Sequence, residues 1–311
     1  MVMTYTRREL GRLMLTLPVA GLLPRDVFGA VQAKPNSRWA GVQVGLNVPY
    51  NYGSRDLPID ETLAKTLELG ISAVELRSQP IELAMGAPAT GQRGQDQKVA
   101  AETLRAWRLA ADPSKAAATK KKWDQAGVKI DVLKYDGIYN FSDPEMDYAF
   151  KLAKALDVRA ISCELEVDGS KRVGEFADKH GVIVAYHGHT KTPAAMFDTA
   201  FGYAKHNWAN IDIGHWVAGN FGNPADYIKQ HHARITHIHV KDRKATTGPT
   251  EGPNTPFGEG DTPIKDVLRL IRDNKWPIQA TIEFEYKVPD GSDRMKEIAK
   301  TIQYCKDALL T

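Results

Sequence analysis

The sequence predicts a closed parallel (β/α)8 barrel, the TIM-barrel fold. From about residue 40 onward, short apolar runs alternate with longer amphipathic segments, which is the pattern of a βαβ series. Eight strand-like runs can be counted, and that number favours a closed barrel over an open doubly wound sheet. The length of 311 residues also suits one barrel of roughly 250 residues with extensions.

Each expected strand is a short run rich in apolar residues. The expected strands cover residues 41–46, 71–76, 128–134, 159–164, 182–187, 209–213, 235–240 and 278–284. Helical spacing of apolar residues fills the gaps between them. The expected helices cover residues 59–69, 173–180, 226–230, 267–271 and 295–309, and a further one opens with Asp143 as N-cap and Pro144 at its first position.

Two longer stretches interrupt this alternation. Residues 80–115 are rich in Gly, Ala, Pro and Gln, and we expect an extended loop followed by a long helix there. Residues 244–263 are rich in Gly, Pro and Thr and follow the seventh expected strand. Loops of this length on a compact domain usually form the rim or lid of a functional site.

Composition excludes several classes of protein. The 41 basic and 38 acidic residues give a net charge of only +3, so nucleic acid is not an expected partner. The two cysteines, Cys163 and Cys305, are far apart in the chain, and they do not indicate a disulfide framework.

The amino terminus differs from the rest of the chain. The motif Thr6-Arg7-Arg8-Glu9-Leu10 precedes an apolar run at 13–23 and resembles a twin-arginine (Tat) export signal. We expect residues 1–33 to be a signal peptide, with cleavage near Ala33, and residues 34–311 to be a single domain without stable membrane insertion. The protein would then be periplasmic. The alternative is an amphipathic N-terminal helix on a cytoplasmic protein.

The chemistry is expected where the strands end, because active sites of (β/α)8 barrels lie at the carboxyl ends of the strands. Five neighbouring strands end with residues that can bind metal. These are Glu164, His187, Asp212, His239 and Glu283. Carboxylate oxygens and imidazole nitrogens suit Mn²⁺, Zn²⁺, Co²⁺ or Fe²⁺, and a set with several carboxylates favours Mn²⁺.

Further polar residues lie beside these candidates. Residues two apart in a strand share a face, so His189 should lie with His187, and Glu285 with Glu283. A histidine can accept and return a proton near neutral pH. Lys134, at the end of the third expected strand, could stabilise a developing oxyanion, or it could be a solvated lysine.

Two motifs resemble one known family. The Asp-Ile-Gly-His motif at 212–215, the His-Val-Lys-Asp motif at 239–242 and the terminal Glu283 are similar to those of the sugar phosphate isomerase/epimerase family, the xylose-isomerase-like TIM barrels. The resemblance covers residues 40–308 and implies one divalent cation, Mn²⁺ in preference to Zn²⁺, Co²⁺ or Mg²⁺. It also implies metal ligands at Asp212, His239 and Glu283, and a substrate-contacting histidine at His215.

The fourth ligand departs from the family's pattern, since the fifth strand ends in His187-Gly188-His189 where the epimerases have Glu. We expect Glu164 to supply the missing carboxylate, with His187 as the alternative ligand. Glu285 would orient a neighbouring group. A histidine base suits proton removal from one face of the substrate, as in isomerisation or β-elimination, better than a two-carboxylate epimerisation.

The resemblance therefore implies a metal-dependent isomerase, epimerase or lyase that removes a proton α to the carbonyl of a sugar, keto-sugar or related carbohydrate. A 3-keto-glycoside β-elimination lyase is the first alternative, and a non-catalytic exported sugar-binding barrel the second. A DNA repair endonuclease of the same superfamily is disfavoured, because no histidine precedes His180. The expected partner is a small carbohydrate, and a homo-oligomer is compatible with the sequence.

Overall fold

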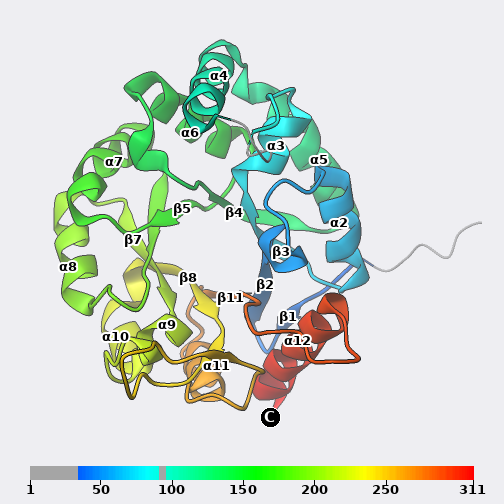
Figure 1. Ribbon diagram of the computed structural model, residues 1–311, viewed down its shortest axis with the longest axis vertical. Helices are drawn as coiled ribbons and strands as arrows, with labels where there is room; N and C mark the ends of the chain where they lie inside the picture. The colour runs from blue at the N-terminus through cyan, green and yellow to red at the C-terminus, as the bar shows by residue number, and fades with distance from the viewer. Residues whose placement is uncertain (1–33, 91–95) are drawn as a thin grey trace, which may run out of the picture. The chain divides into compact units, whose positions relative to one another are not determined.

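Eight parallel strands close into a barrel in the computed structural model, which describes residues 34–90 and 96–311 (Figure 1). The barrel strands are β2 (Val42–Val48), β3 (Ala73–Arg77), β4 (Lys129–Lys134), β5 (Ala160–Glu164), β6 (Ile183–His187), β7 (Asn207–Asp212), β8 (Ile235–Val240) and β11 (Gln279–Ile282). β2 pairs with both β3 and β11, and this closes the ring. The predicted fold is confirmed.

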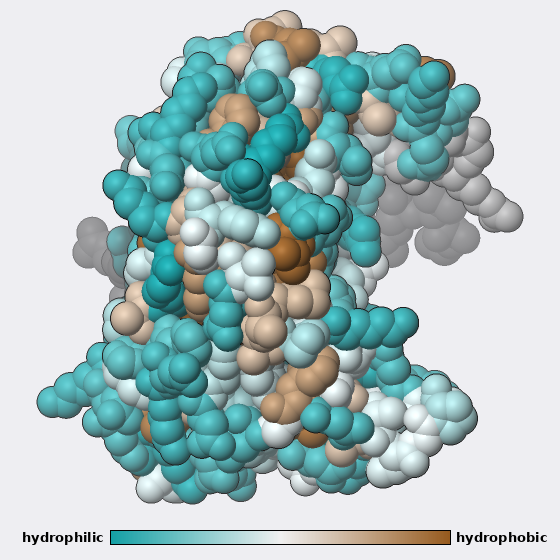
Figure 2. All heavy atoms as spheres, turned by 90° about the vertical axis from the view of Figure 1, so that its left-hand side faces the viewer, coloured by the Kyte–Doolittle hydropathy of each residue, from teal (hydrophilic) through white to brown (hydrophobic). Residues whose placement is uncertain are grey.

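Helices surround the strands (Figure 1). They are α2 (Ile59–Glu68), α3 (Ser78–Ala84), α4 (Gln97–Ala110), α5 (Ala116–Ala126), α6 (Asp143–Ala155), α7 (Val167–His180), α8 (Ala194–Tyr203), α9 (Ile213–Ala218), α10 (Pro224–His231), α11 (Ile264–Asp273) and α12 (Arg294–Leu310). The face over α7 and α8 is largely hydrophilic, with scattered apolar side chains (Figure 2). These helices thus turn polar side chains outward and apolar ones toward the strands.

Two helix starts differ from the prediction. The N-cap of α6 is Ser142 rather than Asp143, because the Ser142 backbone N–H donates to Glu145 Oε2 at 2.9 Å in a capping box. Helix α7 begins at Val167, earlier than expected, and its first turn contains Gly169, which obscured the helical pattern. A Cβ at Gly169 would lie 2.3 Å from the Tyr139 ring, so packing requires glycine there.

The strands alternate between an apolar outer face and a polar inner face. On β8, Ile238 and Val240 are buried in the hydrophobic core, whereas His237 and His239 share the opposite face. Asp212 of β7 is the direct neighbour of His239 in the sheet register. The interior of the barrel is therefore lined with polar side chains, and these lead up to the carboxyl ends of the strands.

The two long stretches are folded onto the barrel. In residues 80–115, α3 and α4 are joined by a buried pair in which the Arg108 guanidinium donates to both Glu82 oxygens, at 2.8 and 2.9 Å. In residues 244–263, the strand β10 (Asn254–Thr255) pairs antiparallel with β9 (Asp242–Arg243), directly after β8. This second stretch therefore lies over the carboxyl end of the barrel.

The described chain begins at residue 34, ahead of the barrel. The predicted signal peptide falls on residues 1–33, which lie outside the described residues. Among the residues that are described, no helix is both long enough and apolar enough to cross a membrane. A short strand, β1 (Arg38–Trp39), pairs antiparallel with β2 where the described chain enters the barrel.

Candidate metal centre

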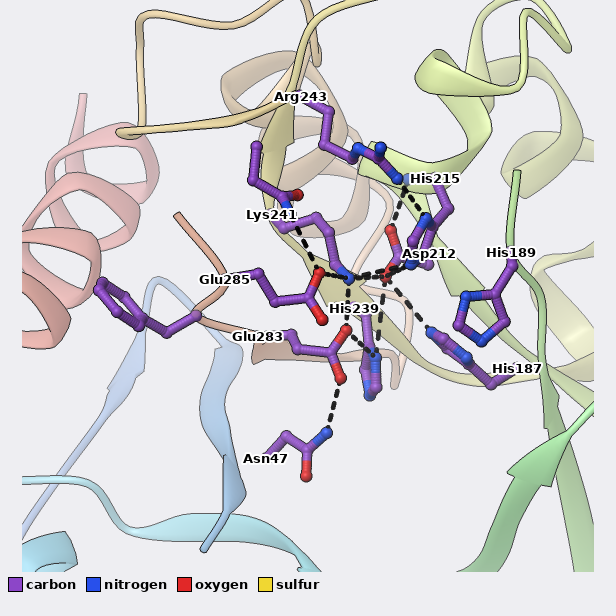
Figure 3. A network of polar contacts seen from close by, with 12 residues as sticks. Asn47, His187, His189, Asp212, His215, His239, Lys241, Arg243, Glu283 and Glu285 are labelled. Carbon is purple, nitrogen blue, oxygen red and sulfur yellow. Dashed lines mark hydrogen bonds and ion pairs between the residues drawn. The ribbon is translucent and has the colours of Figure 1, made fainter. Parts of the chain in front are cut away.

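Four neighbouring strands bring four possible ligands together at the carboxyl end of the barrel (Figure 3). His187 ends β6, Asp212 ends β7, His239 lies near the end of β8, and Glu283 directly follows β11. All four side chains are buried, and their candidate ligand atoms lie within 4.8 Å of one another. We call these four residues the central cluster.

In the central cluster, each carboxylate uses one oxygen for a structural hydrogen bond. Asp212 Oδ1 accepts from the His215 backbone N–H at 2.7 Å, as the N-cap of α9. Glu283 Oε1 accepts from Asn47 Nδ2 at 2.8 Å. The second oxygen of each faces the centre, where Asp212 Oδ2 lies 3.3 Å from His187 Nε2 and Glu283 Oε2 lies 3.4 Å from His239 Nδ1.

The two histidines are arranged in the same way. His187 Nδ1 contacts Glu164 Oε2 at 2.8 Å, and His239 Nε2 contacts Glu75 Oε2. Each imidazole thus donates to a carboxylate on one side and turns its other nitrogen to the centre, an arrangement typical of histidine metal ligands. His239 Nδ1 is buried and has no hydrogen-bond partner among the described residues, so it is available as a ligand. This donor set fits a divalent cation such as Mn²⁺, Zn²⁺ or Co²⁺.

The expected ligand Glu164 lies outside the central cluster. Its Oε1 pairs with Lys134 Nζ at 2.8 Å, and its Oε2 contacts His187 Nδ1 at 2.8 Å and His189 Nε2 at 2.6 Å. Burial would raise the pKa of Glu164, but Lys134 and His187 hold it far below its ordinary value. The geometry therefore favours His187 as the fourth ligand and makes Glu164 the group that orients it.

Lys134 contradicts one of its two expected roles, that of a solvated lysine. Its side chain is almost fully buried and is committed to the Glu164 ion pair, so it is not a solvated lysine. Burial would lower the pKa of Lys134, and the Glu164 carboxylate raises it above its ordinary value. Lys134 therefore stays charged and fixes Glu164, and its contact with a substrate oxygen remains a prediction.

Lys241 was not among the predicted site residues, although it lies in the His-Val-Lys-Asp motif. Its Nζ lies 3.1 Å from Asp212 Oδ2, 2.5 Å from Glu283 Oε2 and 2.7 Å from Glu285 Oε2. Burial opposes the charge, but these carboxylates raise the pKa of Lys241 well above its ordinary value. Its position two residues after His239 was the signal that could have identified it.

His215 is held neutral and oriented by an arginine. Arg243 Nη1 lies 2.7 Å from His215 Nδ1, and because a guanidinium can only donate, this nitrogen accepts. The other ring nitrogen, Nε2, also faces a cation, since Lys241 Nζ lies 3.1 Å from it, and it lies 4.0 Å from Asp212 Oδ2. Burial lowers the pKa of His215 to about 3. Arg243, which the sequence interpretation missed, is itself tied to the Gly252 carbonyl at 3.0 Å.

Two more of the predicted residues lie on opposite sides of the central cluster (Figure 3). His189 follows β6, its side chain is 54% exposed, and its ring centroid lies 4.6 Å from that of His215. Glu285 lies on the other side and accepts from Tyr50 Oη at 2.7 Å. The site thus has an accessible imidazole on one flank and a Lys241–Glu285–Tyr50 group on the other.

Glu75 is a third residue that sequence reasoning missed. It is fully buried on β3, contacts His239 Nε2, and lies 3.6 Å from His237 Nε2. Burial would raise the pKa of Glu75, but His239 and His237 lower it well below the ordinary value. A carboxylate inside a strand that faces the barrel interior was the available signal.

The fold and the central cluster together define a (β/α)8 barrel with a polar, cation-compatible centre at the carboxyl ends of its strands. Residues 63–308 match the family described as "Xylose isomerase-like TIM barrel". Because this match covers most of the chain, the protein belongs to the xylose isomerase-like TIM barrel family.

Individual relatives are distant. An inosose dehydratase of Clostridium botulinum (strain Alaska E43 / Type E3) is 22% identical over 191 residues, which are 56% of this chain and 58% of that protein's length. A xylose isomerase domain protein from Planctomyces limnophilus superimposes with a TM-score of 0.60 at 15% identity, over 87% of this chain and 97% of that one. The 3-keto-D-glucoside 4-epimerase YcjR from E. coli gives 0.54 at 12% identity, over 86% and 99%.

The choice between His187 and Glu164 as fourth ligand leads to a direct prediction. We expect His187→Gln to abolish stoichiometric binding of Mn²⁺. Glu164→Gln should retain the ion with an affinity about 10- to 100-fold weaker, since it only orients the ligand. Elemental analysis and titration with Mn²⁺ measure both, and His206→Gln, a partly exposed histidine paired with Asp178, is the matched control. Loss of the ion in Glu164→Gln with retention in His187→Gln would reverse the assignment.

Metal affinity should also depend on pH. Burial would lower the pKa of His239, but Glu75 and Glu283 raise it to about 10, so below that pH the metal-free imidazole carries an extra proton. A ligand nitrogen must be unprotonated, and binding must therefore displace that proton. Affinity should rise about tenfold per pH unit for each proton released between pH 6 and 8. Calorimetry in buffers of different ionisation enthalpy measures the release, and a pH-independent affinity would contradict it.

Proposed function

We propose that this protein is a divalent-metal-dependent enzyme that removes a proton α to the carbonyl of a sugar, keto-sugar or cyclitol, and so catalyses an isomerisation or a β-elimination. The observation that carries the proposal is the central cluster, in which four buried side chains each turn one possible ligand atom to a common point, and His239 Nδ1 has no hydrogen-bond partner among the described residues. A barrel built only to bind sugar would have no need for this costly burial of charge.

A divalent cation held by His187, Asp212, His239 and Glu283 would polarise a substrate carbonyl and so acidify the adjacent C–H bond. Mn²⁺ is the proposed ion, since two of the four ligands are carboxylates. The remaining steps fall to the side chains around the cluster.

His189 is the proposed general base. Its imidazole is exposed toward solvent, and its Nε2 contacts Glu164 Oε2 at 2.6 Å, which orients the ring and stabilises it when it takes a proton. The neutral His215 beside it lies between Arg243 and Lys241, and it would contact a substrate hydroxyl or carbonyl oxygen. The α proton would pass to His189, and the electrons of the C–H bond would delocalise onto the carbonyl oxygen.

The opposite flank would complete the reaction. Lys241 carries its proton at all ordinary pH values and is held by Glu285, which also accepts from the Tyr50 hydroxyl. In a β-elimination, the bond from the β carbon to its oxygen breaks as the C=C bond forms, and Lys241 would protonate the departing oxygen. In an isomerisation, the same flank would assist proton transfer between neighbouring oxygens.

A 3-keto-glycoside lyase is the second candidate. Proton donors on one flank and a base on the other suit departure of an alkoxide, which requires an acid on the leaving oxygen. The names of the inosose dehydratase and the 3-keto-D-glucoside 4-epimerase reported above both indicate substrates that carry a ring ketone. We further propose that the signal expected in residues 1–33 directs the protein out of the cytoplasm.

Proton exchange with solvent tests the proposed reaction. Mn²⁺-loaded protein in D2O should place deuterium on the carbon α to the carbonyl of an active ketose, inosose or 3-keto-glycoside, as followed by NMR. We expect His189→Gln to slow this exchange about 10²- to 10⁴-fold with metal content unchanged. Lys241→Met should also retain the ion, because it removes a cation that competes for Asp212 and Glu283.

The controls separate the competing functions. His206→Gln should exchange at the wild-type rate. A wild-type protein that binds Mn²⁺ and these sugars without exchange or product would contradict the proposed enzyme and support the non-catalytic barrel.

A further inference from the structure

A cavity opens directly beside the central cluster. It has a volume of about 490 Å³, within the range of sites that hold small molecules. The lining side chains come from η1 (Tyr50–Tyr52) and the loop after it, from β10, from the segment after β11 and from the start of α12. They belong to Tyr50, Ser54, Arg55, Asn254, Phe284, Glu285 and Arg294.

Glu285 connects this cavity to the central cluster. One of its oxygens accepts from Tyr50, and the other pairs with Lys241, which in turn contacts Asp212 and Glu283. Asn254 also donates to Glu285, at 3.4 Å. A molecule whose carbonyl lies at the central cluster can therefore extend past Glu285 into the cavity.

The charges around the cavity do not cancel. The lining side chains carry two positive charges, on Arg55 and Arg294, against the one negative charge of Glu285, which also contacts Lys241. Asp136 is the nearby acid, and it is shared between Arg77, which contacts it closely, and Arg55, whose Nη1 lies 3.8 Å away. Arg55 and Arg294 therefore leave an excess of positive charge at the cavity wall.

Of the two arginines, Arg294 is better placed to bind an anion. Its Nη1 donates to the Asn51 carbonyl at 3.0 Å, and its guanidinium carbon lies 5.0 Å from the centroid of the Phe284 ring, a cation–π contact. Among the described residues, it forms no ion pair within 4.0 Å. A guanidinium that is anchored in this way, with donors remaining, is suited to bind a carboxylate or phosphate.

We propose that this cavity is a subsite for an anionic group of the substrate, so that the enzyme acts on an acidic carbohydrate that carries a carboxylate or a phosphate. This inference rests on the proposed function, because it places the reacting carbonyl at the central cluster. Arg294 binds the anionic group, and Arg55 adds charge from the more exposed side. The subsite determines which carbohydrates are accepted, and the central cluster performs the chemistry.

Direct binding tests the subsite without requiring turnover. Calorimetric titration of the full chain, with and without Mn²⁺, would compare D-glucuronate and glucose 6-phosphate with neutral glucose. We expect at least one of the acidic sugars to bind tenfold or more tightly than glucose, with an affinity that falls as salt rises. The tighter of the two identifies carboxylate or phosphate as the group bound.

Two variants locate the effect. Arg294→Gln should remove most of the preference for the acidic sugar, and Arg55→Gln should reduce it by a smaller factor. Arg172→Gln, an arginine on α7 paired with Asp143, is the matched control and should bind as wild type does. Thermal unfolding of each variant verifies that it is folded, and the two arginine positions provide independent tests.

Equal binding of acidic and neutral sugars, or a preference unchanged in both Arg294→Gln and Arg55→Gln, would overturn the subsite. Failure of the proposed function has a different signature. In that case, the protein would bind no divalent ion and exchange no proton, while the Arg294-dependent preference for acidic sugars would remain.

Discussion

The structure depends most on the hydrogen bonds that turn one possible ligand atom of each member of the central cluster toward the centre. Glu164 and Glu75 each hold the outer nitrogen of a histidine, and Asn47 holds one oxygen of Glu283. These contacts fix the rotation of side chains that would otherwise repel or pair with one another. Because partners at a metal site orient its ligands and tune their basicity, the chemistry proposed here follows from this outer set of residues as much as from the ligands themselves.

Burial of so much charge requires compensation, and the barrel supplies it within the same layer of side chains. Lys241 contacts three carboxylates, Lys134 contacts Glu164, and Arg243 faces neutral His215. Such a network stabilises a buried site only when every charge is paired. Removal of one partner leaves a buried charge without compensation, which costs about several kcal/mol of stability. The exception is the cavity beyond Glu285, where arginine charge exceeds the acid beside it. This excess of positive charge distinguishes the cavity, as a site for an anionic ligand, from the paired charges around the central cluster.

Much of the fold was predictable, because alternating apolar runs report strand and helix periods directly. The sequence left open whether Glu164 or His187 is the fourth ligand, because the two residues are direct neighbours in the register of β5 and β6. Both therefore face inward, and the sequence does not show which side chain extends to the metal centre. Glu75 was missed for another reason: it contacts His239 from β3, and β2 and β11 separate these strands in the sheet. Periodicity identifies the face of each strand, but contacts across the barrel depend on closure. Lys241 follows the last residue of β8, where strand periodicity no longer applies.

The central claim is that one divalent cation binds where β6, β7, β8 and β11 end. The number of ions per chain, measured by elemental analysis after loading with Mn²⁺ and removal of the excess, tests it most directly. Wild type should retain about one ion. Asp212→Asn and Glu283→Gln should retain almost none, and Asp136→Asn, a carboxylate outside the cluster, should match wild type. A wild type that binds no ion from Mn²⁺, Co²⁺ or Zn²⁺, or variants that keep it, would contradict the claim.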